Sequence, residues 1–107
     1  MSTGNNGIDI TKNIKIIEWL KSELLSSVAS LFEILVRGIK GQKDILADVL
    51  ANIILVTYIL GQRLGISYSK MDRKIEDKIK LGVLEEHKLE SWFGDLSSFR
   101  KHLNRED

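Results

Sequence analysis

The stretch DILADVLANIILVTYILGQRL, residues 44–64, decides the fold because it is apolar on nearly every face. From residue 49 to residue 60 the only polar side chains are Asn52, Thr57 and the phenol of Tyr58. A helix that is hydrophobic all round must be covered on all sides. We therefore expect a central helix on which the other helices pack. Asp48 and Asn52 are four residues apart, which places them on one face near its start.

Upstream of this stretch, apolar residues recur at three- and four-residue steps from Ile10 to Leu35. This spacing predicts one long helix, or two helices that abut near Ser22, with Asp9 or Thr11 as the N-terminal cap. Glycines at positions 38 and 41 bracket a short loop before the central helix. A loop of this length predicts that the two helices form an antiparallel hairpin.

Downstream, the central helix is expected to end near Gly65, and a third helix to begin after Ser67 or Ser69 and to stop at Gly82. Two short helices then follow, separated at Gly94. The predicted organisation is a disordered tail over residues 1–8, a single helical domain over residues 9–104, and a loose C-terminus over residues 105–107.

Composition supports an all-α fold and excludes several classes of function. The 107 residues include no proline and no cysteine, so disulfides and thiolate metal sites are excluded, which suits a cytoplasmic protein. The 16 basic and 15 acidic residues give a net charge of +1, so nucleic acid is not an expected partner. The uncharged run over residues 49–62 is shorter than the roughly 20 residues of a membrane span, so no membrane segment is expected.

Four serines on the first helix are unusual because serine is a mediocre helix former. Ser22, Ser26 and Ser30 lie at steps of four on one side, with Ser27 beside them. One interpretation is close packing, since small side chains allow a neighbouring helix to approach. The other is a polar pocket that faces Asp48 and Asn52 across the hairpin.

The runs SELLSSVASLFEILVRG and KDILADVLANIILVTYILGQRLGI resemble the MazG-like branch of the all-α nucleoside triphosphate pyrophosphohydrolases. The resemblance spans residues 9–94 and rests on hydrophobic spacing, loop length, the ADVL stretch and the RLGI connection before a lysine-rich helix. It implies a four-helix-type bundle, here with short C-terminal helices, that assembles as a homodimer or homotetramer. It also implies release of pyrophosphate from nucleoside triphosphates, with Mg²⁺ held by the motifs EExxE and ExxD.

The positions of these motifs carry almost no carboxylates in this chain. The EExxE positions fall on Ser26, Ser27 and Ser30, and the ExxD positions fall on Ile45 and Asp48. A serine hydroxyl is neutral and is a poor Mg²⁺ ligand without carboxylates beside it. Asp48 is therefore the one metal ligand that the resemblance leaves, and no catalytic residue is assigned.

Other residues provide alternatives to the lost motif. Glu23, Glu33 and Asp44 could form a relocated site; otherwise the two glutamates are solvated, and Asp44 lies where acids suit the helix dipole. The resemblance also places a phosphate-binding lysine at Lys78, which with Asn52 would line a nucleotide pocket. Lys78 is otherwise a solvated lysine.

Together these features predict a MazG-like protein without hydrolase activity, in a structural, regulatory or nucleotide-sensing role and without a cofactor. One alternative is an active Mg²⁺-dependent nucleoside triphosphate pyrophosphohydrolase with relocated ligands. Another is an adaptor that binds a protein partner through the C-terminal aromatic segment around Trp92 and Phe93.

Overall fold

The computed structural model describes residues 6–105, and all the regular structure in this part of the chain is helical. The all-α class predicted from the sequence is therefore confirmed. The chain divides between Ser67 and Tyr68 into two compact units, which are described separately below. The single domain predicted over residues 9–104 stays a prediction.

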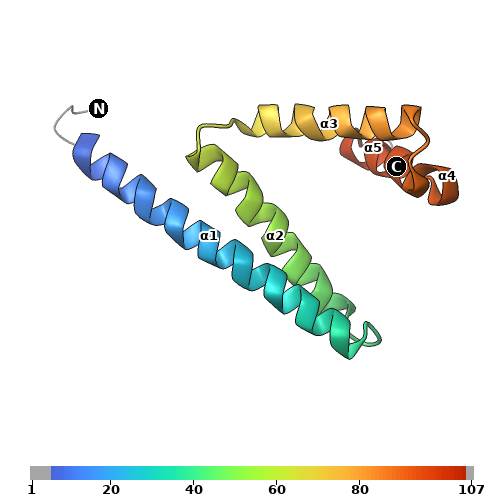
Figure 1. Cartoon of the computed structure of the whole chain (residues 1–107), viewed down its shortest axis with the longest axis horizontal. Helices are drawn as coiled ribbons and strands as arrows, with labels where there is room; N and C mark the ends of the chain where they lie inside the picture. Colours follow the sequence, from blue (N-terminus) through green and yellow to red (C-terminus); the bar gives the residue numbers. More distant parts are fainter. Residues whose placement is uncertain (1–5, 106–107) are drawn as a thin grey trace. The chain divides into compact units, whose positions relative to one another are not determined.

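The first unit is an antiparallel hairpin of two helices, α1 (Asn6–Arg37) and α2 (Lys43–Arg63) (Figure 1). The loop between them contains Gly38 at a φ of +100° and Gly41 at a φ of +75°, a backbone conformation that favours glycine. At the other end of the hairpin, the Asn13 side-chain amide donates a 3.2 Å hydrogen bond to the carbonyl of Arg63. The predicted hairpin is confirmed, with one continuous helix upstream of the loop.

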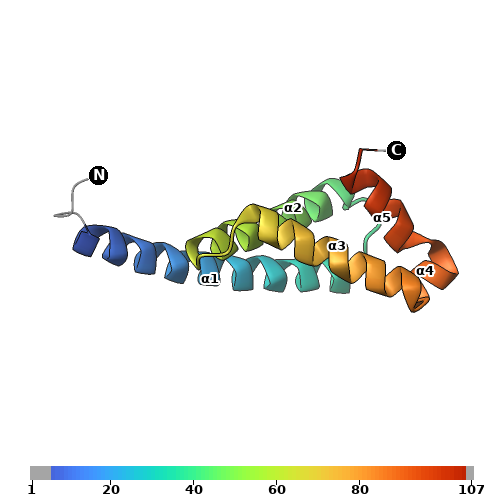
Figure 2. The same cartoon turned by 90° about the horizontal axis from the view of Figure 1, so that it is seen from above.

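Helix α1 starts earlier than the sequence predicted. It begins at Asn6, so neither Asp9 nor Thr11 is its N-terminal cap. Most of the predicted tail, residues 1–5, lies outside the described residues. Because Asn13 lies beside the end of α2, residues 6–12 extend about 10 Å past the shorter helix, at 1.5 Å per residue (Figure 2). The side chain of Ile10 in this overhang is exposed.

A thin core lies between the two helices of the hairpin. On α1 the buried side chains are Leu20, Ser27 and Ile34, seven residues apart, and on α2 the buried side chain is Val56. Seven residues are close to two helical turns, so the three α1 residues lie along one line. The hairpin therefore buries one side of each helix.

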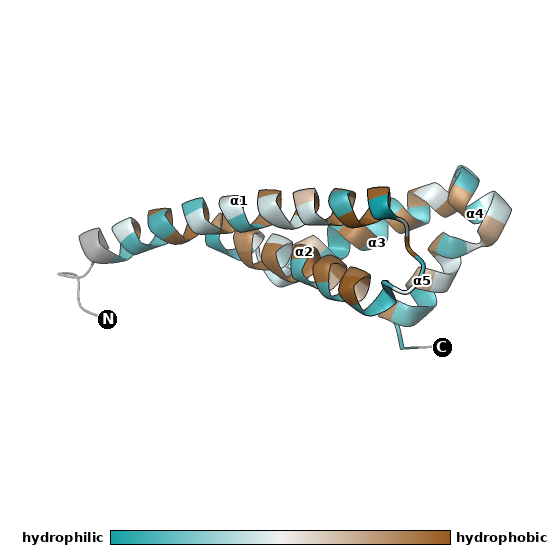
Figure 3. Cartoon of the chain, turned by 90° about the horizontal axis from the view of Figure 1, so that it is seen from below, coloured by the Kyte–Doolittle hydropathy of each residue, from teal (hydrophilic) through white to brown (hydrophobic). Residues whose placement is uncertain are grey.

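Within this unit, helix α2 is covered on one side only, and the packing of further helices around it stays a prediction. A single neighbouring helix covers only one side, and α2 leaves four large apolar side chains exposed, which are Ile45, Leu50, Ile54 and Leu55. The helix is coloured brown over most of its length in Figure 3. Over an 18-residue stretch of α2 the mean hydropathy is 1.8, so the helix is long and apolar enough to cross a membrane, a test that core helices of soluble proteins also pass. The absence of a membrane segment stays a prediction.

The end of α2 near Gly65 is confirmed. Gly65 has a φ of +90°, its amide donates to the carbonyl of Gln62 at 3.1 Å, and the amide of Ile66 donates to the carbonyl of Gly61 at 2.8 Å. This pair of bonds is the Schellman motif, which satisfies the last carbonyls of a helix.

Helix α3 (Tyr68–Leu84) of the second unit begins directly after Ser67 but does not stop at Gly82, so that prediction is wrong. The left-handed position that ends the helix belongs to Glu86, at a φ of +51°, and the amide of His87 donates to the carbonyl of Gly82 at 2.8 Å. Gly82 has a different role. A Cβ atom there would lie 2.5 Å from Cδ1 of Leu96, so glycine allows the helices of this unit to approach closely.

The remaining helices of the second unit are α4 (Lys88–Phe93) and α5 (Asp95–Leu103), and the predicted break at Gly94 is confirmed. Arg100 Nε of α5 donates a 3.0 Å hydrogen bond to Glu76 Oε1 of α3. The core of this unit contains Ile79, which is 4% exposed. The ion pair between Arg100 and Glu76 thus connects α5 to α3.

Glu90 of α4 stabilises the start of α5. Gly94 precedes that helix and has no side chain to accept a hydrogen bond from its first amides. The Glu90 carboxylate accepts instead from the Ser97 hydroxyl and, at 2.9 Å, from the Ser97 amide. These hydrogen bonds from the hydroxyl and the amide lower the pKa of the Glu90 carboxyl. A carboxylate at this place also interacts favourably with the helix dipole.

Candidate functional site

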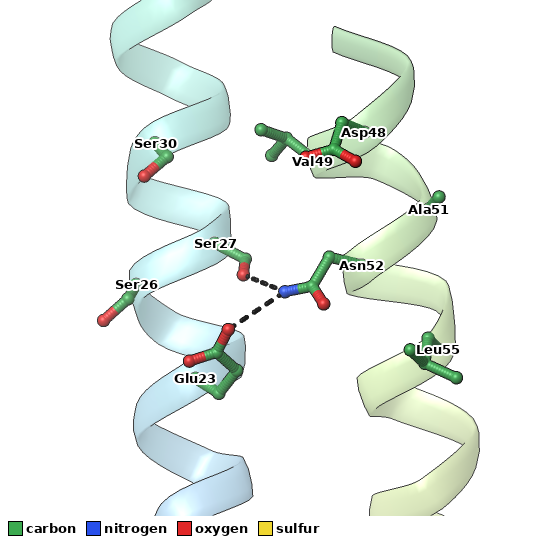
Figure 4. A pocket seen from close by; sticks show the side chains of 9 residues that line it. All are labelled: Glu23, Ser26, Ser27, Ser30, Asp48, Val49, Ala51, Asn52 and Leu55. Carbon is green, nitrogen blue, oxygen red and sulfur yellow. Dashed lines mark hydrogen bonds between the residues drawn. The ribbon is translucent and has the colours of Figure 1, made fainter. Parts of the chain in front are cut away.

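A cavity of about 650 Å³ opens between α1 and α2 of the hairpin (Figure 4). Polar side chains line it from both helices, and the apolar side chains of its wall come from α2. The nine lining residues are Glu23, Ser26, Ser27, Ser30, Asp48, Val49, Ala51, Asn52 and Leu55. The structure therefore brings the serines of α1 and the polar start of α2 to one place.

Asn52 connects the two walls of this cavity. Its Nδ2 atom donates a 2.8 Å hydrogen bond to Ser27 Oγ and a 3.1 Å hydrogen bond to Glu23 Oε1, both drawn in Figure 4. An ionised carboxylate can only accept, so the amide must turn its nitrogen toward Glu23. Both N–H groups of Asn52 are then used, and its Oδ1 remains as an acceptor.

Ser27 explains why the polar contact lies in the hairpin interior. Its side chain is 9% exposed and lies in line with buried Leu20 and Ile34. A buried hydroxyl without a partner destabilises a protein, so Ser27 needs the amide of Asn52. The serine thus contributes to both the core and the cavity wall.

The other predicted motif positions are placed in different environments. Ser26, Ser30 and Asp48 line the cavity and are exposed to solvent. Ile45 does not line it, and its side chain is 54% exposed. Lys78 lies on the exposed side of α3, in the second unit.

Among the acids considered for a relocated site, only Glu23 lines the cavity. Glu23 is half-buried, so it is not the solvated residue that one interpretation expected. Glu33 is exposed and lies 3.8 Å from Arg37. Asp44 is exposed in the first turn of α2, away from the cavity lining. The four-residue spacing of Glu23 and Ser27 indicated that Glu23 lies beside the motif positions. It did not identify Asn52 as the hydrogen-bond partner of Glu23.

The donor set of the cavity does not fit the Mg²⁺ site that the motifs EExxE and ExxD describe. Two carboxylates are present, Glu23 and Asp48, and one oxygen of Glu23 already accepts from Asn52. Within residues 6–105, no group of three or more acidic, histidine or cysteine side chains could hold a metal. Mg²⁺ requires hard, charged oxygen ligands, which neutral serines do not replace.

Comparison with known families gives one match. A family model described as the MazG-like family matches residues 10–96, which is most of the chain. The search found no matching curated protein and no matching solved structure.

Proposed function

Since the chain belongs to the MazG-like family, we propose that it is a non-hydrolytic member that keeps the helical fold and uses its pocket in a regulatory or structural role. The observation that carries this proposal is the pairing of Glu23 with Asn52. The only carboxylate on the α1 wall accepts a hydrogen bond from the opposite helix, while the three motif positions on that wall are serines.

The chemistry of pyrophosphohydrolysis supports this proposal. Metal ions would be needed to neutralise the triphosphate and to activate the attacking water. Asp48 is the one carboxylate at the motif positions, and its side chain is exposed. A single such ligand holds Mg²⁺ weakly, so the residues of the cavity do not supply what the hydrolytic step requires.

The direct test is an assay for pyrophosphate release. The purified chain is incubated with a panel of nucleoside triphosphates and Mg²⁺ or Mn²⁺, beside the Asp48→Ala variant. We expect both proteins to give the rate of the buffer blank. Turnover by the wild type that is lost in Asp48→Ala would overturn the proposal.

That outcome would favour the runner-up, an active Mg²⁺-dependent pyrophosphohydrolase with relocated ligands. The observation in its favour is that Glu23 and Asp48 line the same cavity. The nucleotide ligand implied by the family is tested in the same samples, by the shift in melting temperature on adding each nucleotide without metal.

An adaptor function is the second alternative, and the exposed aromatic side chains of α4 favour it. Trp92 is 68% exposed and Phe93 is 69% exposed. Large exposed aromatic side chains are typical of binding surfaces. A pull-down with the full chain, compared with Trp92→Ala and Phe93→Ala variants, tests this function.

Self-association as a homodimer or homotetramer is part of the proposal, and a stripe on α1 supports it. Leu25, Ala29, Phe32 and Val36 follow steps of four, three and four residues, the spacing of a coiled-coil seam. Leu25 is 73%, Phe32 63% and Val36 88% exposed. This seam lies opposite the line of Leu20, Ser27 and Ile34, so a second copy would cover the side of α1 that α2 leaves open. The cytoplasmic location of the protein stays a prediction.

A further inference from the structure

The charge of the cavity between α1 and α2 is opposite to what a nucleoside triphosphate needs. Its nine lining residues include two acids, Glu23 and Asp48, and no lysine, arginine or histidine. Like charges repel, and the repulsion is strongest where part of the solvent is excluded. With a donor set that does not fit Mg²⁺, the cavity itself selects against a polyanion.

The hydrogen-bonding groups of the cavity are mainly acceptors. Asn52 uses both of its N–H groups within the hairpin, so it offers only its Oδ1 atom. Glu23 offers its second carboxylate oxygen, and Asp48 lines the cavity with two more. The hydroxyls of Ser26 and Ser30 can accept as well as donate. A ligand that matches this set is rich in N–H donors.

The two acids lie on different walls of the cavity and at different heights along it. Glu23 lies opposite Asn52, and Asp48 lies four residues before Asn52, about 6 Å away along the axis of α2. Val49 and Ala51 form an apolar part of the α2 wall between Asp48 and Asn52, and Leu55 continues this apolar wall beyond Asn52. Two carboxylates flanking an apolar wall suit a short methylene chain with an ammonium group at each end.

We propose that this cavity binds an aliphatic amine in its ammonium form, with a short diamine placing one nitrogen at Glu23 and the other at Asp48. The inference rests on the proposed non-hydrolytic function, because the same pocket in a hydrolase would hold metal ions and a triphosphate. The ammonium group belongs either to a free diamine or to a lysine side chain of a peptide. Both sources present the same N–H donors and positive charge.

The test is calorimetric titration of the full chain at low ionic strength with 1,4-diaminobutane, with 1,4-butanediol as the uncharged ligand of the same length. A short peptide with one lysine forms the third arm. The protein variants are Asp48→Asn, which keeps the shape of the side chain, and Asp44→Asn as the matched control one turn away. We expect binding of the diamine but not the diol, and a three- to tenfold loss of affinity in Asp48→Asn alone.

Tighter binding of the diamine than of the peptide identifies a free diamine as the ligand, and the reverse order identifies a lysine side chain. Equal binding of diamine and diol, or equal effects of Asp44→Asn and Asp48→Asn, would overturn the inference. The pyrophosphate assay is run on the same samples. Turnover there contradicts the proposed function, whereas silent titrations without turnover contradict the amine site only.

Discussion

Asn52 of α2 donates a 2.8 Å hydrogen bond to Ser27 of α1, a hydroxyl that is 9% exposed and lies in line with buried apolar side chains. This contact satisfies the one buried polar side chain of the described core. It also fixes the register of the two helices at the cavity, because a shift of either helix would separate the amide from the hydroxyl and from Glu23.

Replacing Asn52 with alanine is therefore expected to lower the free energy of unfolding by about 1–3 kcal/mol, because it leaves the Ser27 hydroxyl buried without this partner. Urea unfolding followed by circular dichroism measures the change. The control is Ser27→Ala/Asn52→Ala, which removes both groups and should recover part of the loss. A double variant that loses the sum of the two single effects would contradict coupling between these residues.

At Gly82, alanine is expected to destabilise the chain even though alanine is the better helix former. The added Cβ would lie 2.5 Å from Leu96 Cδ1, so the packed Leu96 side chain must change its conformation or its helix must shift, at about 1–3 kcal/mol. The melting temperature of Gly82→Ala should fall, and it should recover in Gly82→Ala/Leu96→Ala relative to Leu96→Ala alone. An unchanged melting temperature would mean that Leu96 moves aside freely.

Stability is expected to depend on pH through Glu90. Its pKa is lowered from 4.5 in the folded chain, so its contribution is present above that value and is lost as the pH falls through the lower folded pKa. The measurement compares urea midpoints of wild type and Glu90→Gln between pH 7 and pH 3. The difference should be largest above pH 5 and should shrink in acid. A difference that stays constant over this range would exclude the carboxylate as its source.

The seam on α1 should determine the oligomeric state. Phe32→Asp introduces a charge in the middle of the stripe, so self-association should weaken at least tenfold in analytical ultracentrifugation. Trp92→Asp is the matched control, since that aromatic side chain is similarly exposed but lies in the second unit. A monomeric wild type, or equal effects of the two variants, would contradict assembly through α1.

Much of the fold could be predicted from local sequence signals. The hairpin follows from the apolar periodicity on either side of Gly38 and Gly41, and the end of α2 follows from Gly65 at a left-handed position. The end of α3 could not be predicted in this way. Glu86 adopts a conformation that favours glycine, while Gly82 serves a close approach of Leu96 that only the packing reveals.

For the candidate site, the sequence predicted which residues share a side of each helix, but not which side chains contact one another. Helical spacing places Ser27 on the side that faces the amide-bearing start of α2, as one interpretation of the serines expected. Spacing alone does not show how far each side chain reaches across the hairpin. The hydrogen bond from Asn52 to Glu23 depends on that reach. The sequence alone therefore left open whether Glu23 lies in solvent or in the cavity wall.

The overhang of α1 has a consequence for how this helix opens. Residues 6–12 lie beyond the end of α2, and their helical hydrogen bonds depend on propagation from the turn that Asn13 holds. Amide hydrogen exchange should therefore be graded along a single helix, fast before Asn13 and slowest around Leu20 and Ile34. A single continuous helix would thus contain an N-terminal segment that opens locally and a C-terminal segment that is protected from exchange.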